Sequence, residues 1–243
     1  MCVLEGPDLV EAALASGVEF EAVYVDAAAL DAASITALSQ RAGAAGVRVF
    51  ALSEGVVEKI ADAQTPQPVL AAVRFERPEV TSMAKAGLTL VLHDLRDPGN
   101  VGTIIRSADA AGVTAVILTG QSVDPFNPKT LRASAGSIFH LPVVVASIEA
   151  TLAHFSDTQL LATVVRDGRS HREVDLTIPS VVVIGNEADG LDAATIERCA
   201  TTISIPMDGK SESLNAGVAA SLIAFEALWQ RRDAAATPTP RSL

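Results

Sequence analysis

The chain has 243 residues, of which 49% are hydrophobic, and it carries a formal net charge of −11. That length suits one large domain or two small ones, and no apolar run approaches the ~20 residues needed to cross a bilayer. The N-terminus lacks the basic and then apolar stretches of a signal peptide. We therefore expect a soluble, cytoplasmic protein, whose acidity disfavours tight, nonspecific binding to nucleic acid.

The cysteines, histidines and charged residues limit the kinds of site that this chain can form. Cys2 and Cys199 are too few for a disulfide framework, and the four histidines share no metal-binding spacing, so no metal is predicted. Residues 1–80 carry five basic and twelve acidic side chains, against thirteen and seventeen in 81–243. Basic residues near expected strand ends predict a locally positive cleft: Arg96, Arg106, Lys129, Arg132, Arg166, Arg169, Arg172 and Lys210.

Residues 1–73 alternate β-like and helical patterns, which predicts a small α/β domain. In chain order we expect a short apolar start at 1–4, a helix at 9–16, a strand at 21–25, a helix at 34–42, a strand at 47–50, a helix at 54–61 and a strand at 69–73. The charged, proline-bearing stretch that follows predicts an interdomain linker at 74–87.

A second α/β domain is expected at 88–232. Its first run, Leu88–Leu92, is apolar enough for a buried parallel strand. Further strands are expected at 113–118, 141–145, 160–165, 181–184 and 202–206, and helices up to about 111 and at 129–134, 148–155, 193–199 and 214–231. Residues 233–243, rich in Ala, Thr and Pro, predict a disordered tail.

Two of these helices have informative faces. In the helix that ends near residue 111, an apolar stripe predicts the core-facing side and leaves Arg106 free to face a cleft or a partner subunit. The members of that stripe are Val101, Ile104, Ile105 and Ala108. The last helix has a strongly periodic stripe of Leu214, Val218, Ser221, Leu222, Phe225, Leu228 and Trp229. Its small residues predict close helix packing: Gly217, Ala220 and Ala224.

Three stretches join the end of an apolar strand to polar residues, at 100–106, 184–190 and 205–215. If the strands are parallel, all three loops emerge at the same edge of the sheet, where α/β proteins bind ligands. The polar side chains expected to meet there are Asn100, Arg106, Glu187, Ser213 and Asn215. The sequence therefore predicts a small-molecule cofactor held at this edge beside a catalytic site.

Each of these five residues also has a simpler structural explanation. Asn100 is a typical helix cap, Arg106 is compatible with a solvated helix charge, and Glu187 with an ordinary loop acid. Ser213 and Asn215 are both common at helix starts. Their occurrence together, in one order, favours the functional interpretation over five separate structural ones.

At these residues the chain resembles a known family, the SpoU-type RNA ribose 2'-O-methyltransferases of the SPOUT superfamily. The resemblance rests on the Asn-x5-Arg spacing from Asn100 to Arg106, a Gly-x-Glu-x-x-Gly-Leu loop from Gly185, and an Ile-Pro-Met block followed by Ser-Leu-Asn. It covers roughly Leu88 to Trp229. Upstream, Leu4-Glu5-Gly6, Val10-Glu11-Ala12 and Thr65-Pro66-Gln67 resemble the small substrate-binding domain often fused to such enzymes.

This resemblance implies a deep trefoil knot, a bent S-adenosylmethionine cofactor and a homodimer formed through the knotted domain, with the small residues of the last helix at its interface. By motif position, the residues implied for the cofactor are Gly185, Ile205, Leu214, Thr163, Ile184, Asn186, Pro206 and Met207. Arg106 would be the main catalytic residue, and because an arginine is always protonated, its role in positioning phosphate and oxyanion is more secure than a role as base. Asn100, Ser213 and Asn215 would orient Arg106 and the ribose, and Glu187 would order the loop or the substrate.

The leading hypothesis is S-adenosylmethionine-dependent methylation of a ribose 2'-hydroxyl in RNA, most plausibly 23S rRNA. Two alternatives stay open: a tRNA 2'-O-methyltransferase, and a noncatalytic RNA- or ribosome-assembly binding protein. A nucleotide-dependent Rossmann enzyme is disfavoured because no Gly-x-Gly-x-x-Gly follows the first strand of either domain.

Overall fold

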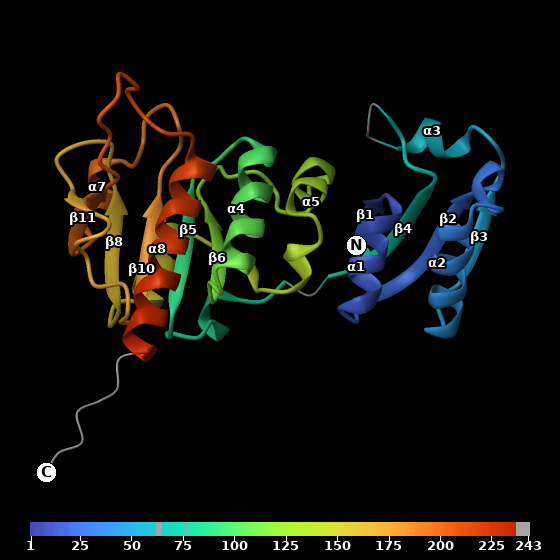
Figure 1. Cartoon of the computed structure of the whole chain (residues 1–243), viewed down its shortest axis with the longest axis horizontal. Coiled ribbons are helices and arrows are strands. Elements are labelled where there is room, and N and C mark those ends of the chain that lie inside the picture. The colour runs from blue at the N-terminus through green and yellow to red at the C-terminus, as the bar shows by residue number, and fades with distance from the viewer. Residues whose placement is uncertain (62–64, 76, 237–243) are drawn as a thin grey trace, which may run out of the picture.

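The computed structural model describes residues 1–61, 65–75 and 77–236, which form two β-sheets flanked by helices (Figure 1). The elements of the first sheet and its helices are β1 (Cys2–Glu5), α1 (Pro7–Ala15), β2 (Glu19–Asp26), the 3-10 turn η1 (Ala27–Ala29), α2 (Ala33–Ala44), β3 (Val49–Leu52), α3 (Val56–Ile60) and β4 (Val69–Arg74). Their strand order is β1-β4-β2-β3.

One face of this smaller sheet packs against α1 and α2. β4 pairs antiparallel with β1 and β2, and β3 adds parallel to β2. Because side chains alternate along a strand, Val23 and Val25 share one side of β2 and belong to the same buried cluster as Val10 of α1 and Leu38 of α2.

The larger sheet is parallel throughout, in the order β7-β6-β5-β10-β8-β11-β9. Its elements and connections are η2 (Val80–Ser82), β5 (Leu88–His93), α4 (Pro98–Ala110), β6 (Ala115–Thr119), α5 (Pro128–Ser134), η3 (Ser137–Phe139), β7 (Val143–Val145), α6 (Ile148–His154), β8 (Gln159–Thr163), β9 (Arg169–Ser170), β10 (Ser180–Ile184), α7 (Ala193–Glu197), β11 (Thr201–Ser204) and α8 (Ala216–Ala236). Parallel pairing places the carboxyl ends of all these strands at one edge, which the polar loops then occupy.

The larger sheet is buried on both faces, as its continuous apolar strands require. On β10, Val182 and Ile184 join the buried cluster that includes residues of α4 and α8. Val181 and Val183 point the other way and pack in a second cluster with Leu152 of α6. Figure 1 shows α8 lying beside α4 on one face, and the two helices are in contact. The sheet is thus the middle layer of an α/β/α sandwich.

Most elements predicted from the sequence are present, with ends that differ by one or two residues. The two-residue strand β9 carries no apolar alternation, so no pattern indicated it. β11 ends at Ser204, ahead of Pro206, because proline has no N–H for the sheet. Within the described ranges, no helix is both long and apolar enough to span a membrane.

The predicted last helix was wrong at both ends. It begins at Ala216 rather than Leu214, because Asn215 occupies the capping position before it. It continues to Ala236, because alanine has the highest helix propensity. Residues 233–236 of the predicted disordered tail are therefore helical, and residues 237–243 lie outside the described residues.

Candidate functional site

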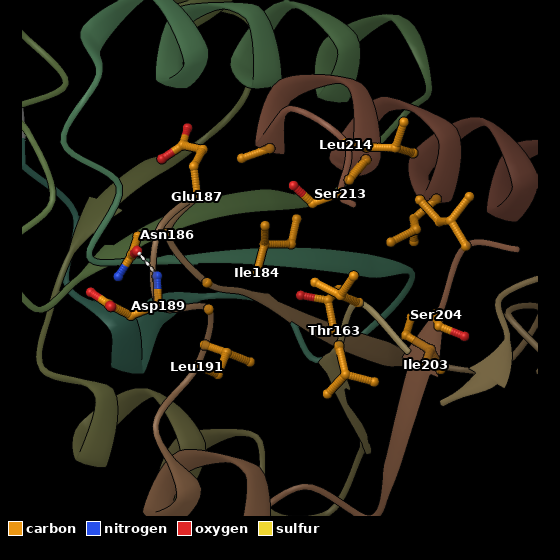
Figure 2. A pocket seen from close by; sticks show the side chains of 18 of the residues that line it. Thr163, Ile184, Asn186, Glu187, Asp189, Leu191, Ile203, Ser204, Ser213 and Leu214 are labelled. Carbon is orange, nitrogen blue, oxygen red and sulfur yellow. Dashed lines mark hydrogen bonds between the residues drawn. The ribbon is translucent and has the colours of Figure 1, made fainter. Parts of the chain in front are cut away.

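A cavity of about 290 Å³ lies at the carboxyl ends of β8, β10 and β11. Its walls come from the residues that follow these strands, from the loop before α8 and from the first turns of α8. In Figure 2, Ile184 lies between Glu187 and Ser213 on one side and Thr163 and Ile203 on the other. Such crevices outside the strand ends are where parallel α/β sheets bind ligands.

The loop after β10 forms one wall of the cavity and is tightly folded. Asn186 Oδ1 accepts hydrogen bonds from the backbone N–H groups of Ala188 at 2.9 Å and Asp189 at 2.8 Å (Figure 2). Asn186 also forms a backbone bridge with Gly190. A Cβ at Gly185 would lie 2.3 Å from the carbonyl carbon of Gly190, so only glycine fits there without displacing the loop.

A chain of hydrogen bonds joins the three polar stretches at the mouth of the cavity. The Asn100 amide nitrogen donates to Glu187 Oε1, and the Asn215 amide nitrogen donates to Asn100 Oδ1 at 2.9 Å. These residues come from α4, from the loop after β10 and from the residue before α8. Segments far apart in the sequence therefore meet through side chains that lie in or beside the connections after parallel strands.

The two asparagines differ in their structural roles. Asp97, not Asn100, caps α4, by accepting the backbone N–H of Asn100 at 2.8 Å. This hydrogen bond, together with the charge of Lys129, holds the pKa of Asp97 below its usual range. Asn215 does cap its helix, because its Oδ1 accepts the N–H of Gly217 at 2.9 Å, and it still has its amide group free to donate to Asn100. Helix capping therefore does not explain why an asparagine stands at position 100.

Nine of the thirteen predicted site residues line the cavity: Thr163, Ile184, Gly185, Asn186, Glu187, Ile205, Met207, Ser213 and Leu214. Asn100 and Asn215 lie behind this lining and reach it through Glu187. Pro206 does not line the cavity and is exposed. The sequence analysis missed Val164, Val165, Leu191, Ile196, Ile203, Ser204, Ala219 and Ile223, which also line it. For Val164, Val165, Ile203 and Ser204 the available signal was a position at the end of a strand, and for Ala219 and Ile223 a separation of one helical turn on α8.

Arg106 lies apart from the cavity. It is exposed on α4, is not among the lining residues, and forms no hydrogen bond or ion pair with the described part of the chain. Its neighbour Ser107 accepts a 2.7 Å hydrogen bond from Ser221 of α8, so this stretch of α4 is fixed against α8. The guanidinium therefore projects from a fixed helix toward solvent.

The small residues of α8 pack closely within the chain, as the sequence predicted, and part of the apolar stripe of this helix faces outward. The small residues pack inside the chain: Gly217, Ala220 and Ala224 are buried, and a Cβ at Gly217 would lie 3.5 Å from Thr103 Cγ2 of α4. Because these small residues are buried within the chain, they are not on the outward surface of α8 that a partner subunit could contact. The outward face is instead apolar, with Val218, Leu222 and Trp229 exposed by 48%, 40% and 54%.

Several cations surround the cavity-bearing edge of the sheet. Arg96 follows β5, Arg166 follows β8 and Lys210 lies in the loop before α8; all three are exposed, and none pairs with a carboxylate among the described residues. The same part of the chain contains no group of three or more His, Cys, Asp or Glu side chains placed to hold a metal ion. An anionic ligand would thus find free cations at this edge of an acidic protein.

A parallel sheet with a strand-end cavity, lined by glycine-bearing loops, defines an α/β protein built to bind a small ligand at that edge. Residues 87–225 match the family model described as the SpoU rRNA Methylase family, and residues 1–71 match the MRM3-like substrate binding domain. The chain belongs to the SpoU rRNA methylase family.

Similar proteins span most of the chain. The 23S rRNA (guanosine(2553)-2'-O)-methyltransferase RlmP of Bacillus subtilis is 33% identical over 92% of this chain and 86% of its own length. The AdoMet-bound rRNA methyltransferase from Sinorhizobium meliloti superposes with a TM-score of 0.83 at 30% identity, over 96% of this chain and 87% of that one. The SpoU methyltransferase AviRb from Streptomyces viridochromogenes, in complex with AdoMet, gives 0.80 at 28% identity, over 95% and 90%. These structures confirm the predicted α/β fold with a parallel-sheet methyltransferase domain.

Proposed function

We propose that this protein transfers a methyl group from S-adenosylmethionine to a ribose 2'-hydroxyl of ribosomal RNA. The observation that carries the proposal is the hydrogen-bonded set of Asn100, Glu187 and Asn215 beside the strand-end cavity. Family membership and the 2'-O-methyltransferase relative from Bacillus subtilis support the reaction type and the rRNA substrate.

The residues around the cavity fit S-adenosylmethionine. Apolar groups from three strand ends and from α8 provide surface for an adenine ring, among them Ile184, Ile205 and Leu214. The Glu187 and Asp189 carboxylates line the same cavity and suit a positively charged ligand. When bound, the cofactor supplies an electrophilic methyl group on its sulfonium. Transfer would form the O–CH₃ bond as the S–CH₃ bond of the cofactor breaks, with the hydroxyl proton released to solvent.

In this proposal the polar side chains prepare the ribose for attack. A ribose 2'-hydroxyl is a weak nucleophile, so groups that orient it and stabilise its developing negative charge raise the rate. Asn100 and Asn215 hold Glu187 in place, which fixes the loop that borders the methyl donor's cavity. Ser213 is exposed and lines the cavity, and in this proposal its hydroxyl contacts the ribose. Arg106 supplies a permanent positive charge for the phosphate and the oxyanion.

A homodimer accounts for two features that one chain leaves unexplained. The outward stripe of α8 exposes Val218, Leu222 and Trp229, and contiguous apolar surface of this kind marks an interface. Arg106 lies on the adjoining α4 and does not reach the cavity of its own chain. An isologous contact through α8 would cover the stripe and place Arg106 at the interface. Leu222→Arg should convert the dimer to monomers in analytical ultracentrifugation; an unchanged mass would argue against this interface.

We also propose that residues 205–215 thread a trefoil knot. β11 lies near one edge of the sheet, whereas α8, which follows it, packs on α4 and β5. The intervening loop must therefore pass the carboxyl ends of β8 and β10, where the loop 185–190 lies. The same proposal divides the chain into a substrate-binding domain at 1–73, a linker at 74–87 and a methyltransferase domain at 88–232, in agreement with the two family matches.

The reaction is tested with purified protein, labelled S-adenosylmethionine and separate pools of rRNA and tRNA, followed by digestion to nucleosides. We expect label in 2'-O-methylated nucleosides of rRNA. Label on a base, or in neither pool despite bound cofactor, would sink the proposal. Label in tRNA alone would identify tRNA, rather than rRNA, as the substrate.

Arg106→Ala tests the catalytic assignment. We expect turnover to fall by about 100-fold or more, the scale for losing a charge that stabilises a transition state, while S-adenosylmethionine binding stays unchanged in calorimetry. Arg41→Ala, at an exposed arginine of α2, is the matched control and should retain full turnover. Equal rates for the two variants would remove Arg106 from the mechanism.

A further inference from the structure

The edge strand β3 of the smaller sheet and its neighbour β2 carry a pair of stacked aromatic rings. Tyr24 of β2 and Phe50 of β3 are directly opposite in the parallel register, with ring centroids 5.7 Å apart and planes inclined by 22°. Phe50 is 44% exposed. The Arg48 guanidinium lies over the Phe50 ring at 5.9 Å, with a side chain 69% exposed. Two rings and a guanidinium plane thus form one continuous surface at the β3 edge.

This aromatic surface does not belong to the core. Side chains alternate along β2, so Tyr24 points away from Val23 and Val25, which pack toward α1 and α2. Neither Tyr24 nor Phe50 is a member of the buried clusters or of the residues packed against them. Exposing a phenylalanine in water brings no stability to the folded chain. The surface is therefore available to a ligand with a flat, apolar face.

The charges around the two rings determine which part of a ligand can bind to this surface. Arg48 has a 3.8 Å contact to Glu21, and Arg74 pairs with Glu21 and with Glu19. The first 80 residues carry an excess of seven acidic side chains. Such a surface disfavours a run of phosphates, yet unpaired nucleobases stack on aromatic rings and on arginine planes whatever their sequence. Bases, rather than backbone, match this chemistry.

We propose that Tyr24, Phe50 and Arg48 form a stacking surface for one or two unpaired bases of the RNA substrate. The inference rests on the proposed RNA substrate and adds where an unpaired segment docks. The surface lies within the region that matches a substrate-binding domain. Figure 1 places β3 at the far end of the molecule from β8, β10 and β11, which hold the cavity. The bases bound here are therefore remote from the methylated ribose, and they select the RNA rather than react.

The test uses the full chain and a fluorescent single-stranded 12-nucleotide oligo(A), with a duplex of equal length for comparison. Phe50→Ala should weaken single-strand binding by roughly 5- to 100-fold, the range for losing one stacked base, and Phe50→Trp should restore it. Leu30→Ala, at an exposed leucine of the same region, is the control and should bind as the unmodified chain does. Because stacking releases few counterions, affinity should fall little between 50 and 200 mM salt.

Three outcomes would overturn the stacking surface: equal binding by Phe50→Ala and the unmodified chain, preference for the duplex, or a loss confined to a ribosomal protein partner with naked RNA unaffected. Methyl transfer separates this inference from the proposed reaction. If rRNA is methylated and Phe50→Ala leaves both oligonucleotide affinity and the KM for rRNA unchanged, only the stacking surface fails. If Phe50→Ala loses affinity but no RNA is ever methylated, only the proposed reaction fails.

Discussion

Gly185 controls the shape of the cavity wall because the backbone of Gly190 fills the space where a side chain would go. Gly185→Ala should weaken S-adenosylmethionine binding by about tenfold or more, since relieving such an overlap costs roughly 1–3 kcal/mol and displaces the loop. Gly209→Ala is the matched control in the loop before α8, where an added Cβ meets nothing within 4 Å. Calorimetry with the cofactor measures both, and similar affinities would contradict this account of the loop.

One buried residue, His171, makes the free energy of unfolding depend on pH. It is buried beside β11, its Nδ1 has no partner among the described residues, and burial lowers its pKa below the ordinary value. Above pH ~6.5 the imidazole is neutral in both the folded and the unfolded chain. As the pH falls below that value the unfolded chain takes up the proton first, so the free energy of unfolding decreases.

His171→Gln should therefore show a smaller loss of stability between pH 7.5 and pH 5.5 than the unmodified chain. His140→Gln, at a half-exposed histidine that contacts Asp109, tests whether any histidine has this effect. Urea unfolding at the two pH values gives the comparison. If His171→Gln loses as much stability as the unmodified chain, burial of this imidazole does not set the pH response.

Among the helices, α4 carries Asn100 and Arg106, and its position depends on close packing against α5. A Cβ at Gly102 would lie 2.5 Å from Ala133 Cβ and 2.6 Å from the Thr130 carbonyl oxygen. Gly102→Ala should therefore destabilise the fold by about 1–3 kcal/mol even though alanine favours helices. Gly43→Ala in α2 meets no atom within 4 Å and should stabilise by up to about 1 kcal/mol. Opposite signs in chemical denaturation support the packing; equal signs contradict it.

At the scale of the whole molecule, an ion pair with a buried carboxylate links helix α5 to strand β1 of the smaller sheet. Arg132 of α5 donates to Glu5 of β1 at 2.7 Å, and only 6% of the Glu5 side chain is exposed. Arg132→Gln should cost about 3 kcal/mol, because it removes the cation opposite a buried carboxylate. The double variant with Glu5→Gln should recover part of that loss.

The exposed pair of Lys85 and Asp157, which are 2.8 Å apart, is the control for this prediction. Lys85→Gln should change the free energy of unfolding by less than about 1 kcal/mol, since water screens such pairs. Denaturant unfolding of all three variants separates the cases. Equal costs for Arg132→Gln and Lys85→Gln would show that Glu5 is not held by this contact.

The sequence by itself determined the elements and the polar stretches between them. Apolar runs such as Leu88–Leu92 mark buried strands because a strand covered on both faces must be apolar throughout. The motif spacing around Asn100, Glu187 and Asn215 was visible because each follows a strand, and parallel strands end at one edge. Features of this kind depend on residues that are close together in the sequence, so they can be predicted without a structure.

Only the tertiary structure decided which surfaces those elements cover. Val218 and Trp229 belong to a periodic apolar stripe of α8 and yet are exposed, whereas Phe225 of the same stripe packs against the core. Periodicity shows that a face is apolar but not which partner covers it. The distance of Arg106 from the cavity and the ion pair from Arg132 to Glu5 have the same origin. Both depend on how segments far apart in the chain pack together, which no local pattern encodes.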